Sequence, residues 1–166
     1  MAPILAAAQP ATPEFRGSWP ADPKFGTMHL STNLGSFKLI EGEGKVDFTF
    51  RGTVMVNEKK GLKISTSGNV RMELQRGNRR VYFGQGRIIL DGAFRSVQWF
   101  GRDMRLTWYG RGVARITGEF DKDLNTGYFW YNNPNDKNYW FAGSALTIPV
   151  PQSQESLEVK PRERKE

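Results

Sequence analysis

Hydrophobic and polar residues alternate with a period of two along much of the middle of the chain. In the segment KVDFTFR, residues 45–51, Val46, Phe48 and Phe50 occupy one set of alternating positions, and charged or hydroxyl residues occupy the other. The segments NVRMELQ (69–75) and RDMRLTW (102–108) repeat the pattern, and their apolar positions are Val70, Met72, Leu74, Met104, Leu106 and Trp108. Because successive side chains of a strand point to opposite faces, each segment predicts a half-buried strand of five to seven residues. No window has helical spacing, so the pattern predicts an all-β fold.

Glycines separate the alternating segments at nearly constant intervals. They occupy positions 26, 35, 44, 52, 61, 68, 77, 84, 86, 92, 101, 110, 118 and 127, mostly seven to nine residues apart. Eight of them precede a Val, Ile or Phe by two positions. Since glycine supplies the positive φ that a tight corner requires, this spacing predicts repeated short strands joined at glycine corners.

Two architectures accommodate repeated short strands at 8–9-residue spacing. In a β-solenoid, two steps make one coil of about seventeen residues and the coils stack. In an antiparallel jelly-roll sandwich or barrel, each corner reverses the chain. Constant step length favours the solenoid, whereas the break in alternation between Phe94 and Val97, typical of a β-bulge, and the many Trp residues favour the sandwich. The pattern leaves both architectures open.

The composition divides the chain into three parts. Residues 1–25 are rich in Ala and Pro and predict a disordered leader, in which the alanines before Gln9 resemble the end of a signal peptide. Residues 26–151 predict a single all-β repeat domain, closed at its last edge by a strand over residues 146–150. Residues 152–166 predict a disordered charged tail. The leader favours export or a cell-envelope location, and no stretch is long and apolar enough to predict a transmembrane helix.

The repeated glycine-x-apolar motif resembles a pattern found in known protein families. Gly44-Lys-Val, Gly52-Thr-Val and Gly68-Asn-Val, together with the short strands, resemble bacterial β-solenoid proteins of the bactofilin and adhesin type over residues 26–131. A second likeness is to the jelly-roll domains of lipopolysaccharide-transport proteins. These resemblances imply self-assembly, surface adhesion or the holding of an acyl chain, and they imply no catalysis.

The basic residues are concentrated in the middle of the chain. Thirteen Lys and Arg residues against three acidic residues lie between Lys59 and Arg115, whereas the whole chain has a net charge of +7. A predicted polyanion-binding band comprises Arg87, Arg95, Trp99, Arg102, Arg105, Tyr109, Arg111 and Arg115, with Tyr82 nearby. Outward arginines on stacked strands would attract polyanions, and interleaved rings would stack on bases or sugars. The alternative is that the arginines keep the surface soluble and the rings lie in the core.

The remaining chemistry gives no catalytic or metal site. The chain has no Cys and one His, His29, to which we assign no role. Residues 121–125 match the first positions of a calcium-binding loop, D-x-D-x-N, but Asn132 occupies the position where a bidentate Glu is needed. An Asx turn explains the pattern without a metal. We therefore expect no metal, no cofactor and no enzymatic activity.

Two further motifs have simple structural explanations. The glycine pairs at 84 and 86 and at 110 and 112 precede strands, whereas a phosphate loop precedes a helix. Asp103 with Asp91 or Glu119 could form an acid pair, but cross-strand salt bridges explain these carboxylates.

The expected function is therefore that of a non-enzymatic scaffold or an adhesion and assembly protein of the bacterial envelope, acting by self-association. Two alternatives remain. The first is a polyanion-binding module for nucleic acid, acidic glycan or lipid head groups. The second is a lipid carrier of the jelly-roll type.

Overall fold

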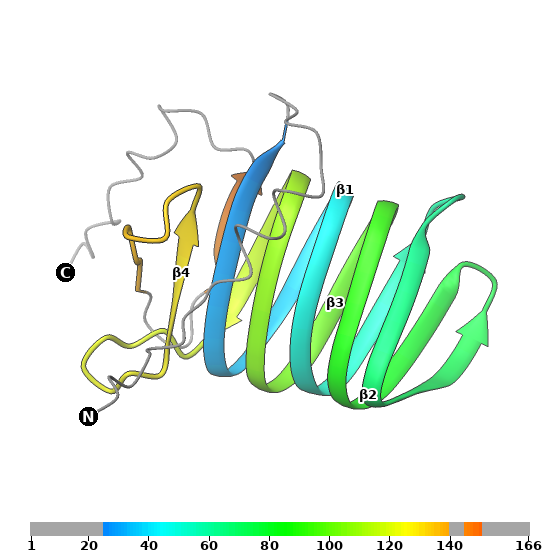
Figure 1. The fold of residues 1–166 in the computed structure, drawn as a ribbon, viewed down its shortest axis with the longest axis horizontal. Helices are drawn as coiled ribbons and strands as arrows, with labels where there is room; N and C mark the ends of the chain where they lie inside the picture. Colours follow the sequence, from blue (N-terminus) through cyan, green and yellow to red (C-terminus); the bar gives the residue numbers. More distant parts are fainter. Residues whose placement is uncertain (1–24, 140–144, 151–166) are drawn as a thin grey trace, which may run out of the picture.

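The protein is all-β in a computed structural model that describes residues 25–139 and 145–150 (Figure 1). The strands are β1 (Gly26–Glu58), β2 (Lys63–Arg76), β3 (Arg79–Gly118), β4 (Gly127–Tyr131) and β5 (Leu146–Val150). They form one open antiparallel sheet in the order β2-β3-β1-β4, and β5 pairs with β3. No described segment is a helix long and apolar enough to cross a bilayer. The all-β prediction is confirmed, while the predicted leader, up to residue 24, and the predicted tail lie outside the described residues.

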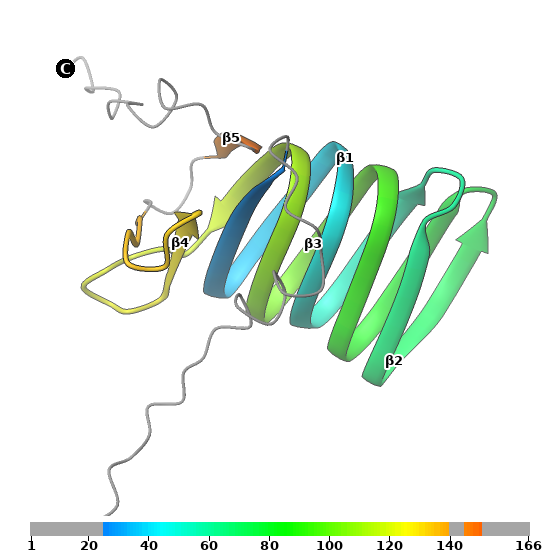
Figure 2. The same ribbon diagram turned by 45° about the horizontal axis from the view of Figure 1, so that its top comes forward.

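β1 and β3 run side by side as a ribbon that winds into a coil (Figures 1 and 2). Many β1 residues therefore contact β3 on both sides. Val46, for example, pairs with Leu90 on one side and with Trp108 on the other. Leu39 pairs with Val97 and Ala114, which lie seventeen residues apart along β3. One turn of the ribbon thus takes about two glycine intervals.

The strands are much longer than the sequence pattern predicts. β1 has 33 residues and β3 has 40, and both continue through the glycines in their interiors. Gly44 and Gly92 lie inside these strands with φ of 120° and 132°. Because glycine has no Cβ, the backbone bends there while its pairing to the neighbouring strand continues. The prediction of strands of five to seven residues is wrong: the glycines mark bends within two long strands.

Glycine lies opposite glycine where the ribbon bends. Gly44 pairs with both Gly92 and Gly110, and a Cβ on Gly44 would lie 2.2 Å from the carbonyl oxygen of Tyr109. The first glycine column contains Gly26, Gly110, Gly44 and Gly92. The second glycine column contains Gly118, Gly35, Gly101, Gly52 and Gly84, with the pair Gly86 and Gly68 beside it. Successive turns approach too closely at the bends for side chains, which explains the glycine spacing in the sequence.

Large side chains fill the interior of the coil. Val46, Phe48 and Phe50 are at most 2% exposed, and the ring of Trp99 stacks on Phe48 with centroids 4.9 Å apart. Met104, Leu106 and Trp108 are also buried. The inward assignment of these six apolar positions is confirmed.

β2 departs from its predicted burial. Val70 is partly buried against the core, but Met72 is 50% and Leu74 is 47% exposed. β2 is the outermost strand at its end of the sheet, so its inward residues have a neighbour on one side only. In addition, the pairing steps from Met72–Tyr82 to Leu74–Val81, so that Glu73 is an extra residue and Leu74 turns to the other face. The prediction that Met72 and Leu74 are buried is wrong for these two reasons.

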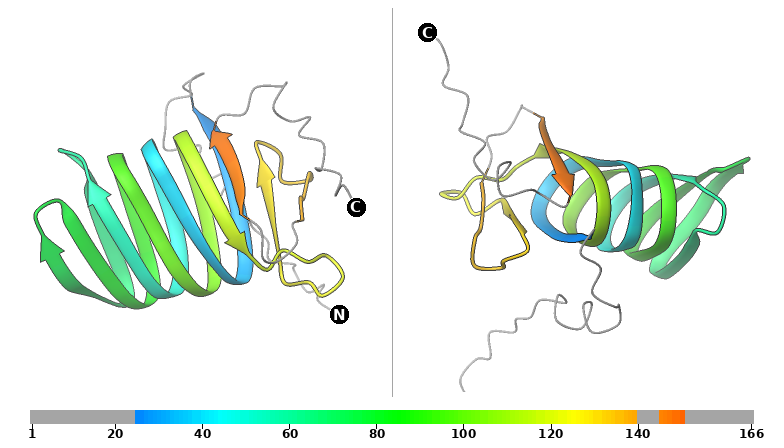
Figure 3. Two further views of the ribbon diagram at one scale, coloured as in Figure 1. Left: turned by 180° about the vertical axis from the view of Figure 1, so that it is seen from behind. Right: turned by 90° about the horizontal axis from the view of Figure 1, so that it is seen from above.

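Two other local predictions are confirmed. Between Phe94 and Val97, the pairing steps from Asn57–Ser96 to Glu58–Phe94, which leaves Arg95 as the extra residue of a β-bulge. At the opposite end of the coil from β2, β5 pairs with Gly112–Ile116 of β3, as predicted for a strand that covers an edge (Figure 3).

Candidate functional site on the outer faces of the coil

The two glycine columns divide the outer surface of the coil into two faces. Directly paired residues of antiparallel strands point to the same side of a sheet, so the pairing register shows which side chains form a row across each face. The mixed-charge face has the rows Tyr128-Ser31-Arg105-Thr49-Arg87-Ser67, Trp130-His29-Thr107-Asp47-Ile89-Ser65 and Tyr109-Lys45-Asp91-Lys63. The acid-free face has the rows Thr117-Ser36-Phe100-Thr53-Phe83-Arg71, Thr147-Arg115-Lys38-Gln98-Met55-Val81-Leu74 and Pro149-Val113-Ile40-Ser96-Asn57-Arg79-Arg76.

The arginines of the predicted band do not share one surface. Arg87 and Arg105 lie on the mixed-charge face, and Arg115 lies on the acid-free face. Arg102 and Arg111 adjoin the second and the first glycine column, respectively, and Arg95 lies in its bulge. All six are exposed, but the coil distributes them around its circumference.

Two of these arginines are already paired with carboxylates. The guanidinium of Arg87 donates to both oxygens of Asp47, over 2.8 Å from Nε and 2.5 Å from Nη2, and this pairing raises the pKa of Arg87. Arg111 forms an ion pair with Glu43. Both pairs weaken the attraction of the band for an external anion.

The rings of the predicted band are buried. Trp99 is 1%, Tyr82 is 5% and Tyr109 is 7% exposed. Trp99 points into the coil, and Phe25 covers the outward-pointing Tyr109 edge to face with centroids 5.5 Å apart. The assignment of Trp99 and Tyr109 to a stacking surface for bases or sugars is wrong, because neither ring is accessible.

The acid-free face carries an apolar patch. We define this apolar patch as Phe83, Phe100, Leu74, Met55 and Val81, which lie in two adjacent rows. Phe83 is 48% and Phe100 is 42% exposed, and they flank Thr53, while the Glu73 bulge turns Leu74 onto the same face. A contiguous exposed apolar patch rimmed by polar residues is typical of an interaction surface.

Basic residues surround the apolar patch. Arg71 pairs directly with Phe83, and its Nη2 also lies 3.4 Å from Oε1 of Glu73, the bulge residue beside this face. Arg79 Nη2 donates to Met55 Sδ over 3.2 Å. Lys38 and Arg115 are directly paired toward the other end of the face, and Arg76 lies beside Arg79. None of the residues in the three rows of this face is Asp or Glu. The result is an apolar centre with a cationic rim.

Two segments of the sequence indicate this patch, because they depart from the alternation of apolar and polar residues. In the segments Val54-Met55-Val56 and Val81-Tyr82-Phe83, both alternating sets of positions are apolar. One set fills the coil, so the other set must point outward.

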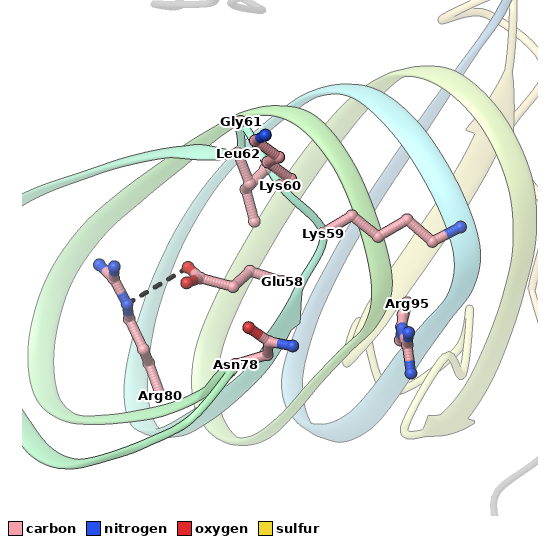
Figure 4. Close-up of a pocket in the computed structure, with 8 residues that line it drawn as sticks. All are labelled: Glu58, Lys59, Lys60, Gly61, Leu62, Asn78, Arg80 and Arg95. Carbon is pink, nitrogen blue, oxygen red and sulfur yellow. Dashed lines mark ion pairs between the residues drawn. The ribbon is translucent and has the colours of Figure 1, made fainter.

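A cationic pocket of about 460 Å³ lies where β1 ends, lined by residues of β1, the β1–β2 connection, the β2–β3 turn and β3 (Figure 4). Its lining is Glu58, Lys59, Lys60, Gly61, Leu62, Asn78, Arg80 and Arg95. Arg80 points toward Glu58, with Nε and Oε2 3.3 Å apart, and Lys59 Nζ lies 2.7 Å from Glu41 Oε2. The bond to Lys59 lowers the pKa of Glu41. Because two of the four cations are engaged in this way, the pocket is a weaker anion site than the acid-free face.

His29 is enclosed on the mixed-charge face. Its Nδ1 lies 2.9 Å from Thr107 Oγ1, and its ring stacks on Trp130 with centroids 5.3 Å apart. Burial and, to a smaller extent, the charge of Arg105 lower the pKa of His29 to about 4. The imidazole is therefore neutral at neutral pH and is held by packing.

Among the acidic residues of the candidate motifs, Asp121 has a structural role, and Asp91 and Asp103 lie apart. The carboxylate of Asp121 accepts hydrogen bonds from the backbone N–H groups of Asp123 and Leu124, at 2.8 and 3.0 Å, which confirms the predicted Asx turn. Asp91 adjoins the first glycine column and Asp103 adjoins the second, so these two carboxylates lie at opposite sides of their face. They do not form an acid pair.

No family model, curated protein or solved structure matches the chain.

Proposed function

We propose that the protein is a non-catalytic β-solenoid scaffold that adheres through its acid-free face to membranes containing acidic lipids. The observation that carries the proposal is the combination, on one face, of an exposed apolar patch with a cationic rim and no carboxylate in its rows. The scaffold supplies a rigid surface, and the face supplies the adhesion.

The pairing register supports a solenoid as the form of the scaffold. β1 meets β3 again after each turn of seventeen or eighteen residues, as Leu39 and Val46 illustrate, and glycines stack from turn to turn. The interior is occupied by stacked rings such as Phe48 and Trp99, which favours a packed core over a cavity for an acyl chain. A coil of this kind is better suited to presenting a surface than to carrying a lipid.

The chemistry of the acid-free face favours a lipid surface over nucleic acid. Phe, Leu and Met side chains gain by insertion among acyl chains at a bilayer interface. Lys and Arg beside them are attracted to anionic head groups by about 1 kcal/mol each. Nucleic acid would be bound best by accessible rings and an arginine array, whereas Trp99 and Tyr109 are buried and Arg87 is paired with Asp47.

Co-sedimentation with vesicles tests this proposal. We expect the protein to bind phosphatidylcholine vesicles that contain phosphatidylserine and not vesicles of phosphatidylcholine alone. Lys38→Gln with Arg115→Gln removes two charges from the acid-free face and should weaken binding roughly thirtyfold, at about 1 kcal/mol per charge. Phe83→Ser with Phe100→Ser should also weaken binding, because both rings are exposed and would insert into the interface. Circular dichroism checks that each variant is folded.

A matched control variant is available outside the acid-free face. Arg51→Gln with Arg105→Gln also removes two exposed charges and should leave vesicle binding nearly unchanged. Equal losses in the control and in the Lys38–Arg115 variant would show that only net charge matters. Binding to RNA or heparin with no binding to vesicles, lost in the control variant, would replace this proposal by a polyanion-binding module.

A further inference from the structure

β2 is a long strand with one edge unpaired by any described strand. Thirteen of its fourteen residues pair with β3 along one edge, and the other edge lies at the end of the coil (Figure 3). Alternate residues of such a strand direct their N–H and C=O groups away from the sheet, where another strand can pair with them. Ile64, Val70 and Met72 continue the inward rows of the coil and are only partly covered or exposed. Within residues 25–139 and 145–150, both the backbone pairing and the core are therefore incomplete at this end.

The glycine pattern indicates what is missing beside β2. Within the coil, Gly35 and Gly44 each have a paired glycine on both sides. Gly68, with φ of 79°, lies at the bend of β2 and has Gly86 on one side only, with its Cα 3.0 Å from the position of a Cβ on Gly68. A strand that continued the coil would place a glycine bend on the open side of Gly68.

We propose that β2 of a second copy of this chain supplies that strand, paired antiparallel about a twofold axis at Gly68. In this register the residue numbers of the two paired residues sum to 136, because Gly68 pairs with Gly68 of the second copy. The resulting pairs are Ser67 with Asn69, Thr66 with Val70, Ser65 with Arg71, Ile64 with Met72 and Lys63 with Glu73 of the second copy. The glycine bends of the two copies coincide, so one coil continues into the other.

The side chains of β2 are complementary in this register. Lys63 meets Glu73 of the second copy, which has the opposite charge, at both ends of the pairing. Glu73 already lies 3.4 Å from Arg71 of its own chain, so Lys63 would join this ion pair. Ile64 meets Met72 of the second copy at inward positions, so each copy covers the open interior of the other. Exposed Met72 thereby gains the second neighbour that the inward residues within the coil already have.

A competing register is centred on Met72. It pairs Arg71 with Glu73 of the second copy, which also satisfies charge. However, it places Gly68 opposite Arg76, beyond the Glu73 bulge, so the bend of one coil would meet a straight part of the other. The stacking of bends seen throughout the coil favours the register centred on Gly68.

The twofold axis determines how the outer faces are arranged. Paired residues point to the same side, and Ser65 of the mixed-charge face pairs with Arg71 of the partner's acid-free face. The two acid-free faces of a dimer consequently point in opposite directions. As far as it rests on the proposed function, this arrangement makes the dimer a bridge between two membranes.

Cysteine cross-linking of the full chain tests the register, because the chain has no Cys of its own. Ser65→Cys and Arg71→Cys are single variants at exposed positions, and their mixture under mild oxidation should give a disulfide-linked dimer as the main product. Directly opposed residues of antiparallel strands have Cα atoms about 5 Å apart, which suits a disulfide. A mixture of Arg71→Cys with Glu73→Cys reports the competing register and should give only background cross-linking. Met72→Lys should make the protein monomeric in sedimentation velocity, and circular dichroism checks its fold.

Three results would overturn the inference. Cross-linking mainly in the Arg71 and Glu73 mixture would replace the register centred on Gly68. A monomer at all concentrations, with fast-exchanging β2 amides, would exclude pairing at this edge. A monomer whose β2 amides are protected would show that another segment of the same chain covers the edge. Vesicle binding is measured separately, so a failed dimer leaves the adhesion proposal standing, and failed adhesion leaves the dimer standing.

Discussion

The two ends of the coil differ in how the core is finished. At the end near β4, Phe120 is fully buried and Phe129 is 4% exposed, and their rings meet edge to face with centroids 5.7 Å apart. At the end near β2, Met72 is 50% exposed and Ile64 only partly buried. Figure 3 shows both ends, with β4 and β5 at one and β2 at the other. Aromatic residues outside the ribbon therefore close one end, and no segment among the described residues covers the other.

This difference indicates a gradient of stability along the coil. In a stacked architecture, each turn is stabilised mainly by its neighbours, and the terminal turns require a cap. β1 and β3 have neighbours on both sides over most of their length, whereas β2 has one. We therefore expect the turn that contains β2 to open locally before the rest.

The largest contrast is expected between Phe120→Ala and Met72→Ala. Removing the Phe120 ring leaves a cavity in the closed end and should lower the free energy of unfolding by about 3–5 kcal/mol. Met72 makes few contacts in the monomer, so Met72→Ala should lower the free energy of unfolding of the monomer by no more than about 0.5–1 kcal/mol. Urea denaturation at low protein concentration measures both. Similar values for the two variants would remove the distinction between the ends.

A smaller contrast is expected at the bends. Gly44→Ala places a Cβ against a backbone carbonyl at positive φ, which should cost roughly 2–4 kcal/mol. Gly68→Ala at the open end has one neighbouring turn and should cost roughly 1–2 kcal/mol through positive φ. Thermal or urea unfolding of the two variants measures the difference. A cost at Gly68 equal to that at Gly44 would mean that β2 is enclosed on both sides.

His29 makes the closed end sensitive to acid. Its pKa is about 4 in the folded protein and about 6.5 when exposed, so the unfolded chain binds the proton more readily. The contribution of His29 is fully present above pH 6.5 and is lost as the pH falls toward 4, by up to about 3 kcal/mol. His29→Gln should flatten this part of the pH profile of unfolding free energy. An unchanged profile in that variant would assign the acid sensitivity to carboxylates.

The sequence predicts the local pattern better than the long-range arrangement. Val46, Phe48 and Trp108 follow from alternation, because a strand exposes its two faces in turn. The continuity of β1 and β3 through glycine does not follow, since a glycine bend and a glycine turn have the same sequence signature. The exposure of Leu74 depends on the extra residue at Glu73, and no local rule predicts that bulge.

The candidate site shows the same limit. The basic composition of the middle of the chain is evident in the sequence, but the pairing register decides which cations share a face. Lys38 and Arg115 are 77 positions apart in the sequence and directly paired in the sheet. The burial of Trp99 likewise follows from its inward position in the coil, which requires knowledge of the winding.

The most direct test of the unfinished end is hydrogen exchange of the full chain at several protein concentrations. The account predicts that amides over residues 63–73 exchange fastest within the coil at low concentration and become protected as concentration rises. Amides over residues 44–49, which have paired residues on both sides, should remain slow throughout. Equal and concentration-independent protection in both segments would contradict an open end that a second copy completes.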